Sequence, residues 1–316
     1  MKNIVFFTSF LIILASCQEN SSRLAKKLPV EIIPTPKVVE AGENALTLTN
    51  KTFGISSSNA ELMPLVYLFR EDLMALSDYN PTVLPNIPDA EITFKIDQTY
   101  AKDEYRIEVK DGILVKAGSY QAAAMARSTL LQLATFENGI LFFPQVLLND
   151  NPDAKYRGLM IDLARNWHSV ENVKKLIDLA SYYKVNYLQL HFTDDQSYTL
   201  PSSKYPKLST PERHYSFDDL RAFESYSQMR GVTIVPEIDI PGHAKSLVTA
   251  YPELFGIAAY QENPYIINMG KEEVYVALND IFSEIIPIFK SSPYFHIGGD
   301  EARFTKVMED PDVKTY

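Results

Sequence analysis

The sequence predicts an α/β protein: a (β/α)8 barrel of which about the first four βα units are present, preceded by a small α+β domain. From residue 151 onward, apolar runs of strand length alternate with amphipathic segments of helix length. This alternation is typical of a parallel sheet covered by helices. Residues 30–150 instead mix short β-rich runs with two helical ones, and the turn-rich run at 149–153 separates the two patterns. We therefore expect domains at 30–150 and 151–316.

In the first domain, period-two apolar patterns predict strands and Ala- and Leu-rich runs predict helices. An Asp111-Gly112 pair between two of the strands predicts a hairpin. The predicted strands are 45–50, 91–97, 105–110 and 113–117, and the predicted helices are 62–76 and 120–135. No chemical motif lies here, so we expect this domain to pack against the second one and position it.

The second domain contains four predicted strands rather than the eight of a closed barrel. The strands are 158–164, 186–192, 232–238 and 294–298, and the helices are 170–183, 217–230 and 271–290, the last bent near Pro287. Residues 150–316 number 167, whereas such barrels take about 250. We expect the open edges of the first and fourth strands to expose backbone groups, which favours self-association.

The amino-terminal residues predict export. Lys2, an apolar run and two small residues make 1–16 a signal peptide that is too short to span a membrane. The order Leu-Ala-Ser-Cys at 14–17 resembles the cleavage box of bacterial lipoproteins, which implies a lipidated Cys17 and a polar tether over 17–29. The alternative is a soluble secreted protein with an incidental cysteine. The expected location is the bacterial cell envelope, with membrane attachment through the lipid only.

Composition excludes several classes of function. The formal net charge of −10 and the absence of a basic run argue against a nucleic-acid partner. Cys17 is the single cysteine, so the sequence offers no disulfide framework, no thiolate metal cluster and no Cys nucleophile. The sequence calls for no cofactor and no metal.

Every predicted strand of the second domain carries ionisable residues at or just after its carboxyl end. Catalytic groups of such barrels project from the carboxyl ends of the strands. A single one of these residues, such as Asp162 or Asp195, is equally well explained as a helix cap, but four strand ends in succession predict a site. The residues are Asp162, Arg165, Asp194, Asp195, Glu237, Asp239, His243, Asp300 and Glu301.

The last strand end carries two adjacent carboxylates, Asp300 and Glu301, after Gly298-Gly299. Glycines let the backbone turn sharply and leave room for a ligand. Most retaining glycosidases use two carboxyl groups from separate positions, about 5 Å apart. Adjacent carboxylates instead suit a 2-acetamido sugar that supplies its own amide oxygen as nucleophile, with one protein acid for the leaving group and one carboxylate for the amide N–H.

Four segments carry a resemblance to a known family. They are RGLMIDLAR at 157–165, HFTDDQ at 191–196, PEIDIPGH at 236–243 and HIGGDE at 296–301. In order and spacing they resemble the successive motifs of family 20 β-N-acetylhexosaminidases, which hydrolyse terminal β-linked GlcNAc or GalNAc with retention. The resemblance covers residues 30–316, most strongly from residue 157 onward, and implies N-acetylhexosamine-containing glycans as substrates.

The resemblance implies a role for each matching residue. Glu301 is the expected general acid and then base, with a raised pKa, and Asp300 is expected to orient the acetamido group and stabilise an oxazolinium-like intermediate. Arg165 is expected to hold the hydroxyls at C3 and C4. Asp194 and His243 would support the site, with Asp239 behind them as a polar partner. For His191 and His296, a structural role is the prediction.

Two departures from the family pattern affect what surrounds the acid pair. The chain has Asn166-Trp167 and Ser197-Tyr198 where the family commonly has His and Trp. In addition, the aromatic wall around the family's sugar comes from later strands than the four found here, which leaves the activity of the half barrel open. Two alternatives stay open: a non-catalytic sugar-binding lipoprotein, and a metal-dependent hydrolase, although a compact His-rich ligand spacing is absent from the sequence.

Overall fold

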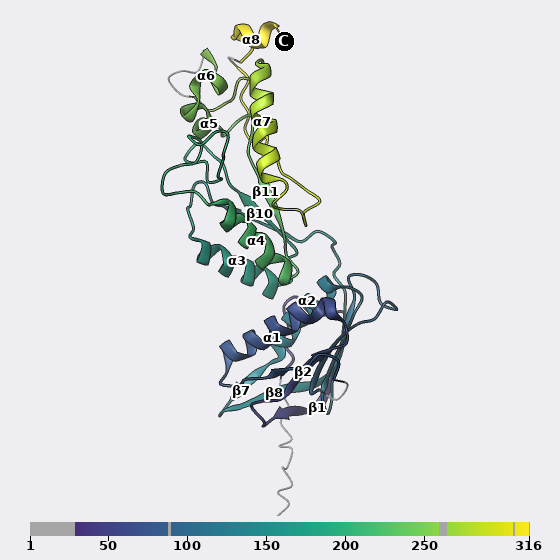
Figure 1. Cartoon of the computed structure of the whole chain (residues 1–316). Helices are drawn as coiled ribbons and strands as arrows, with labels where there is room; N and C mark the ends of the chain where they lie inside the picture. The colour runs from purple at the N-terminus through teal and green to yellow at the C-terminus, as the bar shows by residue number, and fades with distance from the viewer. Residues whose placement is uncertain (1–28, 88–89, 259–263, 306, 316) are drawn as a thin grey trace, which may run out of the picture.

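Two β-sheets, one in each half of the chain, organise the protein (Figure 1). The computed structural model describes residues 29–87, 90–258, 264–305 and 307–315. The signal peptide, Cys17 and nearly all of the tether predicted from the sequence therefore lie outside the described residues. Among those that are described, none of the helices is both long and apolar enough to cross a bilayer.

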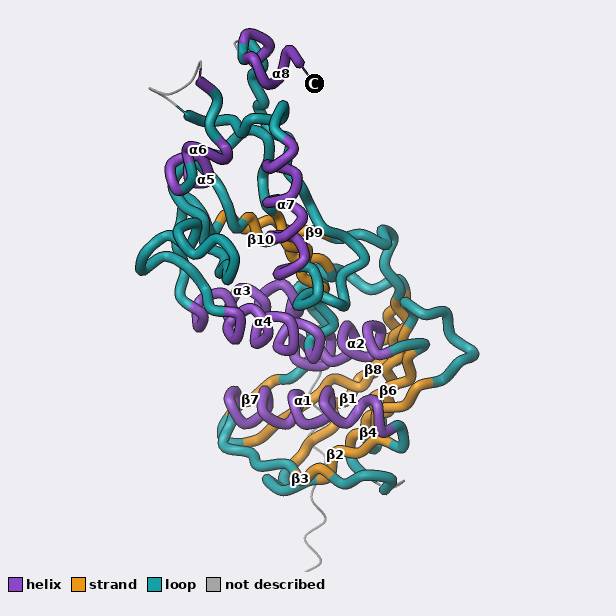
Figure 2. Tube along the Cα trace, turned by 45° about the horizontal axis from the view of Figure 1, so that its top comes forward, coloured by secondary structure: helices purple, strands orange, loops and turns teal. Residues whose placement is uncertain are grey.

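The first sheet has eight strands in the order β1-β8-β5-β6-β4-β2-β3, with β7 paired to β8. The helices α1 (Met63–Leu76) and α2 (Tyr120–Leu133) lie side by side on one of its faces (Figure 2). The apolar residues of the sheet and both helices form one buried core. The strands are β1 (Val38–Leu48), β2 (Gly54–Ser57), β3 (Thr82–Val83), β4 (Ile92–Ile96), β5 (Tyr105–Val109), β6 (Ile113–Ala117), β7 (Thr135–Glu137) and β8 (Ile140–Asp150).

The sequence predicted both helices of this unit and the β5–β6 hairpin, which is antiparallel as expected. It did not predict β2, β3, β7 or β8. The strand β8 contains Pro144, and a proline inside an apolar run is a poor strand signal. The strand predicted at 45–50 corresponds to β1, which begins earlier than expected, at Val38. It continues across a register irregularity between Ala41 and Ala45.

The second sheet has three parallel strands in the order β11-β10-β9. They are β9 (Gly158–Asp162), β10 (Tyr187–His191) and β11 (Thr233–Glu237), and the helices that follow them are α3 (Val170–Tyr182), α4 (Phe217–Met229) and α7 (Glu272–Ile285). Ser169 caps α3, and Ser216 with Asp219 forms a capping box on α4. The predicted bend near Pro287 is instead the end of α7 at Ile285. Short helices complete the unit: α5 (Lys245–Ala250), α6 (Pro252–Phe255), η3 (Val307–Glu309) and α8 (Pro311–Thr315).

The fourth predicted strand, at 294–298, is not a regular strand. It lies beside β11 through an isolated parallel bridge between Glu237 and His296, supported by the bond from His296 N–H to Pro236 O at 2.9 Å. Two physical reasons account for the difference. No second neighbour pairs with this segment within the described ranges, and Gly298 and Gly299 leave the extended conformation with φ values of +68° and +100°.

The two units meet through their helices (Figure 1). The Ser128 hydroxyl of α2 donates to Ser181 O of α3 at 2.8 Å, and the Tyr120 hydroxyl donates to Met229 O at 2.8 Å. The cavity at this junction is lined by α2 and by residues at the amino ends of the strands, among them Arg157 and Asn186. The carboxyl ends of β9, β10 and β11 therefore point away from the first unit.

The outer edge of β9 is open within the part of the chain that the structure describes. Two of its apolar side chains are strongly exposed, Leu159 at 45% and Met160 at 53%. Because consecutive side chains of a strand point to opposite faces of the sheet, both faces of β9 are exposed beside this open edge. Self-association through this edge remains a prediction.

Candidate active site

The carboxyl end of β9 holds an ion pair that fixes the guanidinium of Arg165. It lies at the edge formed by the carboxyl ends of β9, β10 and β11, which we call the mouth of the site. The Asp162 carboxylate accepts from the backbone N–H of Arg165 at 2.8 Å and from its Nη1 at 2.9 Å. The Asp162 side chain thus closes the turn after the strand and orients the arginine at the same time. The Arg165 side chain remains 42% exposed, so part of its donor fork faces the mouth.

The carboxylate of Asp194, after β10, is the point where the strand ends connect. It is buried, and its Oδ2 lies 2.7 Å from Arg165 Nη2 and 3.0 Å from His191 Nε2. Its Oδ1 accepts from the Asp195 N–H at 2.6 Å and lies 3.4 Å from His243 Nδ1. Burial raises the pKa of Asp194, but the hydrogen bond from His191 and the charge of Arg165 outweigh it and hold the pKa below its usual range.

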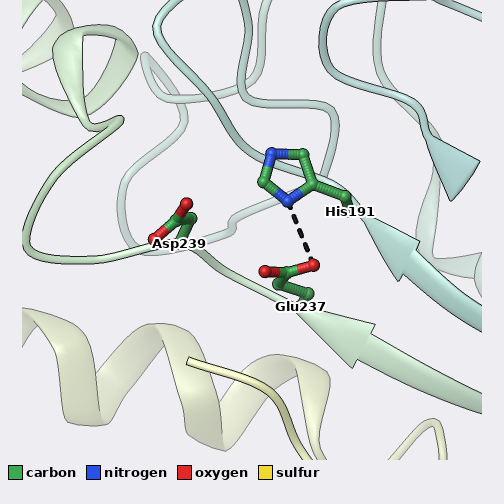
Figure 3. Close-up of side chains that lie close together, drawn as sticks. All are labelled: His191, Glu237 and Asp239. Atoms are coloured by element: carbon green, nitrogen blue, oxygen red, sulfur yellow. Dashed lines mark ion pairs between the residues drawn. The ribbon is translucent and has the colours of Figure 1, made fainter. Parts of the chain in front are cut away.

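His191, which contacts this carboxylate, also pairs with buried Glu237, and Figure 3 shows that second ion pair. His191 Nδ1 is 3.0 Å from Glu237 Oε2, and the same oxygen accepts from Gln189 Nε2 at 2.8 Å. Glu237 Oε1 lies 2.9 Å from His296 Nδ1. Desolvation lowers the pKa of His191, but its bonds to Asp194 and Glu237 dominate and raise it to about 10. Burial likewise raises the pKa of Glu237, and His191 and Gln189 more than reverse the effect.

Asp239 lies behind the backbone of the last strand end. It is fully buried, and its Oδ1 accepts from Gly299 N–H at 2.9 Å. Its Oδ2 is also buried and has no hydrogen-bond partner among the described residues. Burial accordingly raises the pKa of Asp239, against the Gly299 bond that lowers it. A Cβ on Gly298 would lie 1.8 Å from Asp239 Oδ1, so a glycine is required for this approach.

Asp300 and Glu301 follow this turn, and both are exposed. Glu301 has a φ of +47° and His243 a φ of +48°, so both residues adopt the left-handed conformation that is uncommon outside glycine. Glu301 Oε2 lies 3.5 Å from His243 Nε2. The Glu301 side chain is 73% exposed, so among the described residues it lacks the enclosure that a general acid in a closed site would have. His243 therefore bridges the carboxylate of Glu301 to that of Asp194.

Among the described residues, two groups of side chains are close enough to hold a metal ion: His191 with Glu237 and Asp239, and Asp194 with Asp195 and His243. The chemistry of the first group does not fit, because both nitrogens of His191 already face carboxylates and a ligand histidine must offer a free lone pair. In the second group, Asp194 Oδ2 is bound by the Arg165 guanidinium, whose charge opposes a cation. The geometry thus favours an ion-pair network over metal coordination.

Comparison with known proteins decides the family. The model of the glycosyl hydrolase family 20 catalytic domain matches residues 155–316, and that of family 20 domain 2 matches residues 30–151. The chain belongs to glycosyl hydrolase family 20. This result confirms the resemblance seen in the four sequence segments, and makes the chain a member of a glycoside hydrolase family.

Individual relatives of this family 20 chain agree. A β-hexosaminidase of Vibrio furnissii is 30% identical over 306 residues, covering 86% of this chain and 49% of the relative. The structure of the Vibrio harveyi exo-β-N-acetylglucosaminidase, solved with N-acetylglucosamine, has a TM-score of 0.81 at 26% identity and covers 92% of this chain and 50% of that one. A β-N-acetylhexosaminidase from Bacteroides fragilis gives a TM-score of 0.79 at 31% identity, over 90% of this chain and 59% of that one. The chain spans about half the length of the curated relatives it matches.

The structure connects five of the six predicted site residues. Direct contacts link Arg165, Asp194, His243 and Glu301. Asp239 is connected through the backbone of Gly299, which precedes Asp300. The sequence reasoning gave Glu237 no role, although it named the residue at its strand end. The signal was the repeated pairing of a histidine and an acid at the ends of neighbouring parallel strands. Trp167, the single tryptophan, packs its ring against buried Tyr215 at 4.4 Å between centroids.

Proposed function

We propose that this chain carries the acid pair and the sugar-holding arginine of an exo-acting β-N-acetylhexosaminidase, and that it cleaves terminal β-linked GlcNAc or GalNAc by substrate-assisted catalysis with retention. The observation that carries the proposal is the continuous set of contacts from Arg165 through Asp194 and His243 to Glu301. These contacts support the proposal because they bring the Arg165 guanidinium and the Glu301 carboxyl group to one end of the sheet, and Asp300 is the neighbour of Glu301 in the chain.

In the first step, the acetamido oxygen of the substrate attacks C1 while Glu301 gives its proton to the departing glycosidic oxygen. The bond from C1 to that oxygen breaks, and a cyclic oxazolinium-like intermediate forms. Asp300 accepts the amide N–H and offsets the positive charge that develops on the ring. In the second step, Glu301 takes a proton from water, which attacks C1 and reopens the ring. Two inversions at C1 give retention.

The geometry around Arg165 supports its part in this reaction. Its Nη1 is held by Asp162 and its Nη2 by Asp194, so the guanidinium plane is fixed before substrate arrives. Nη2 also lies 3.3 Å from His243 Nδ1, so the Nε–H and the second hydrogen of Nη1 are the donors left for substrate hydroxyls. Because the orientation is set in advance, less side-chain entropy is lost on binding than for a free arginine.

The proposal extends to the architecture and the location. We take β9, β10, β11 and the segment at 294–298 as the first strands of a (β/α)8 barrel, since their parallel order and the open edge of β9 fit that closure. The predicted lipid on Cys17 would attach the protein to the bacterial cell envelope, and the substrates would be N-acetylhexosamine-containing glycans outside the cytoplasm.

The test is hydrolysis of an aryl β-GlcNAc by residues 18–316, with Glu301→Gln as the inactivating variant. The expected result is cleavage that falls by about 10²–10⁴-fold in Glu301→Gln, the usual contribution of a general acid. Glu273→Gln, at an exposed position in α7, is the matched control and should keep full activity. A folded chain that binds GlcNAc without cleaving it would contradict the proposal and favour a sugar-binding protein.

A further inference from the structure

His191 occupies a position that the reaction described above does not use. Its side chain is 5% exposed and lies between two buried carboxylates, Asp194 on one side and Glu237 on the other. Each of its ring nitrogens is 3.0 Å from one carboxylate oxygen. A neutral imidazole has one N–H and one lone pair, so it satisfies only one of these contacts.

Both carboxylates have independent reasons to be ionised. Asp194 Oδ2 lies 2.7 Å from the guanidinium of Arg165, and Glu237 Oε2 accepts from the Gln189 amide at 2.8 Å. An ionised carboxylate facing a nitrogen lone pair at 3.0 Å would be repelled and desolvated without compensation. The arrangement is satisfied when both ring nitrogens carry a proton, and the raised pKa of His191, about 10, agrees with this.

Other titratable groups surround the ring. Asp162 at the end of β9 and Asp239 after β11 interact with it electrostatically, and His296 contacts the far oxygen of Glu237. The imidazolium itself contacts carboxylates at two neighbouring strand ends, Asp194 after β10 and Glu237 on β11. Its partner Asp194 also contacts Arg165 and His243, so any shift of Asp194 moves both residues of the proposed active site.

We propose that His191 is a positioning residue, a doubly protonated ring that locks the carboxylates of Asp194 and Glu237 together and thereby fixes Arg165 and His243 at the mouth. This inference deepens the proposed function, but its test does not require catalysis. Without the ring, two buried carboxylates face each other across a neutral side chain, so one of them takes up a proton and the hold of Asp194 on Arg165 and His243 weakens.

The experiment is histidine-selective ¹⁵N NMR on residues 18–316 across a pH titration. The expected result is that both His191 nitrogens stay protonated from about pH 5 to about pH 9, whereas an unperturbed histidine titrates near about 6.5. A His191 signal that titrates near that ordinary value would overturn the proposal, whether or not the chain cleaves any glycoside.

A second measurement addresses positioning itself. In His191→Gln, the ring ¹⁵N signals of His243 at a fixed pH are expected to move from their wild-type positions, while exposed His214→Gln leaves them in place. A folded His191→Gln protein in which the His243 signals do not move would also overturn the proposal. If His191→Gln does not fold, the titration of the wild-type ring decides alone. If both NMR results are as expected but the wild-type protein does not hydrolyse the aryl β-GlcNAc, the proposed function is contradicted and this inference stands.

Discussion

The contact between Gly298 and Asp239 gives a sharp test of how the last strand end is built. In Gly298→Ala, the new Cβ would lie 1.8 Å from Asp239 Oδ1, so the backbone or the buried carboxylate must move. The φ of +68° adds about 1–2 kcal/mol of strain for a residue other than glycine. Loss of the Gly299 N–H bond to Asp239 leaves a buried acceptor without a donor, at about 1–3 kcal/mol. The two together predict destabilisation of about 2–5 kcal/mol.

Gly299→Ala is the matched control, because it has a φ of +100° but its Cβ would meet nothing within 4 Å in the described residues. The assay is urea unfolding of both variants at equal protein concentration. We expect Gly298→Ala to lose more stability than Gly299→Ala, because its Cβ would also lie 2.6 Å from the backbone Cα of Asp239, which no side-chain movement relieves. Equal losses in the two variants would refute the reasoning.

Two further predictions concern the buried network. Asp194→Asn is expected to cost about 3–5 kcal/mol of unfolding free energy, because it leaves the buried charge of His191 facing a neutral amide. The control is Asp218→Asn at an exposed position of α4, which should change the unfolding free energy by less than about 0.5 kcal/mol. Equal effects of the two variants in urea unfolding would count against the network. Because the pKa of His191 is raised to about 10, its contribution to stability is fully present below about pH 6.5 and is lost as the pH rises through about 10. At about 1.36 kcal/mol per pKa unit, the upper limit of this loss is about 5 kcal/mol. Urea unfolding at several pH values should therefore show a steeper alkaline loss in the wild type than in His191→Gln, and parallel curves would contradict this.

Sequence patterns predicted the elements whose conformation depends mainly on residues close in the sequence. The helices α2, α3 and α4 have strong caps or long amphipathic runs, and their predicted and observed bounds agree within two residues. The strands β2, β3 and β7 are four residues or fewer and depend on sheet neighbours that are remote in sequence, so no local signal marks them. The segment at 294–298 was apolar enough to predict a strand, but strand geometry also depends on a second neighbour and on the two glycines that end it.

The site was predictable to the level of which strand ends contribute, because parallel strands bring their carboxyl ends to one edge of the sheet. The contacts among the side chains within the site were not predictable. Nothing in the sequence indicates that His191 faces Asp194 and Glu237 at once, since this follows from the register that pairs His191 with both Asp162 and Glu237. The positive φ of His243 and Glu301 is likewise a product of the folded loops.

The most direct test of the central claim compares aryl β-GlcNAc with aryl β-glucoside as substrates for residues 18–316 and for Asp300→Asn. The account predicts cleavage of the acetamido sugar alone, and a loss of about 10²-fold or more in Asp300→Asn, because the amide of the substrate is the nucleophile and Asp300 positions it. Comparable cleavage of the plain glucoside, or an Asp300→Asn variant that cleaves the acetamido sugar at the wild-type rate, would contradict it.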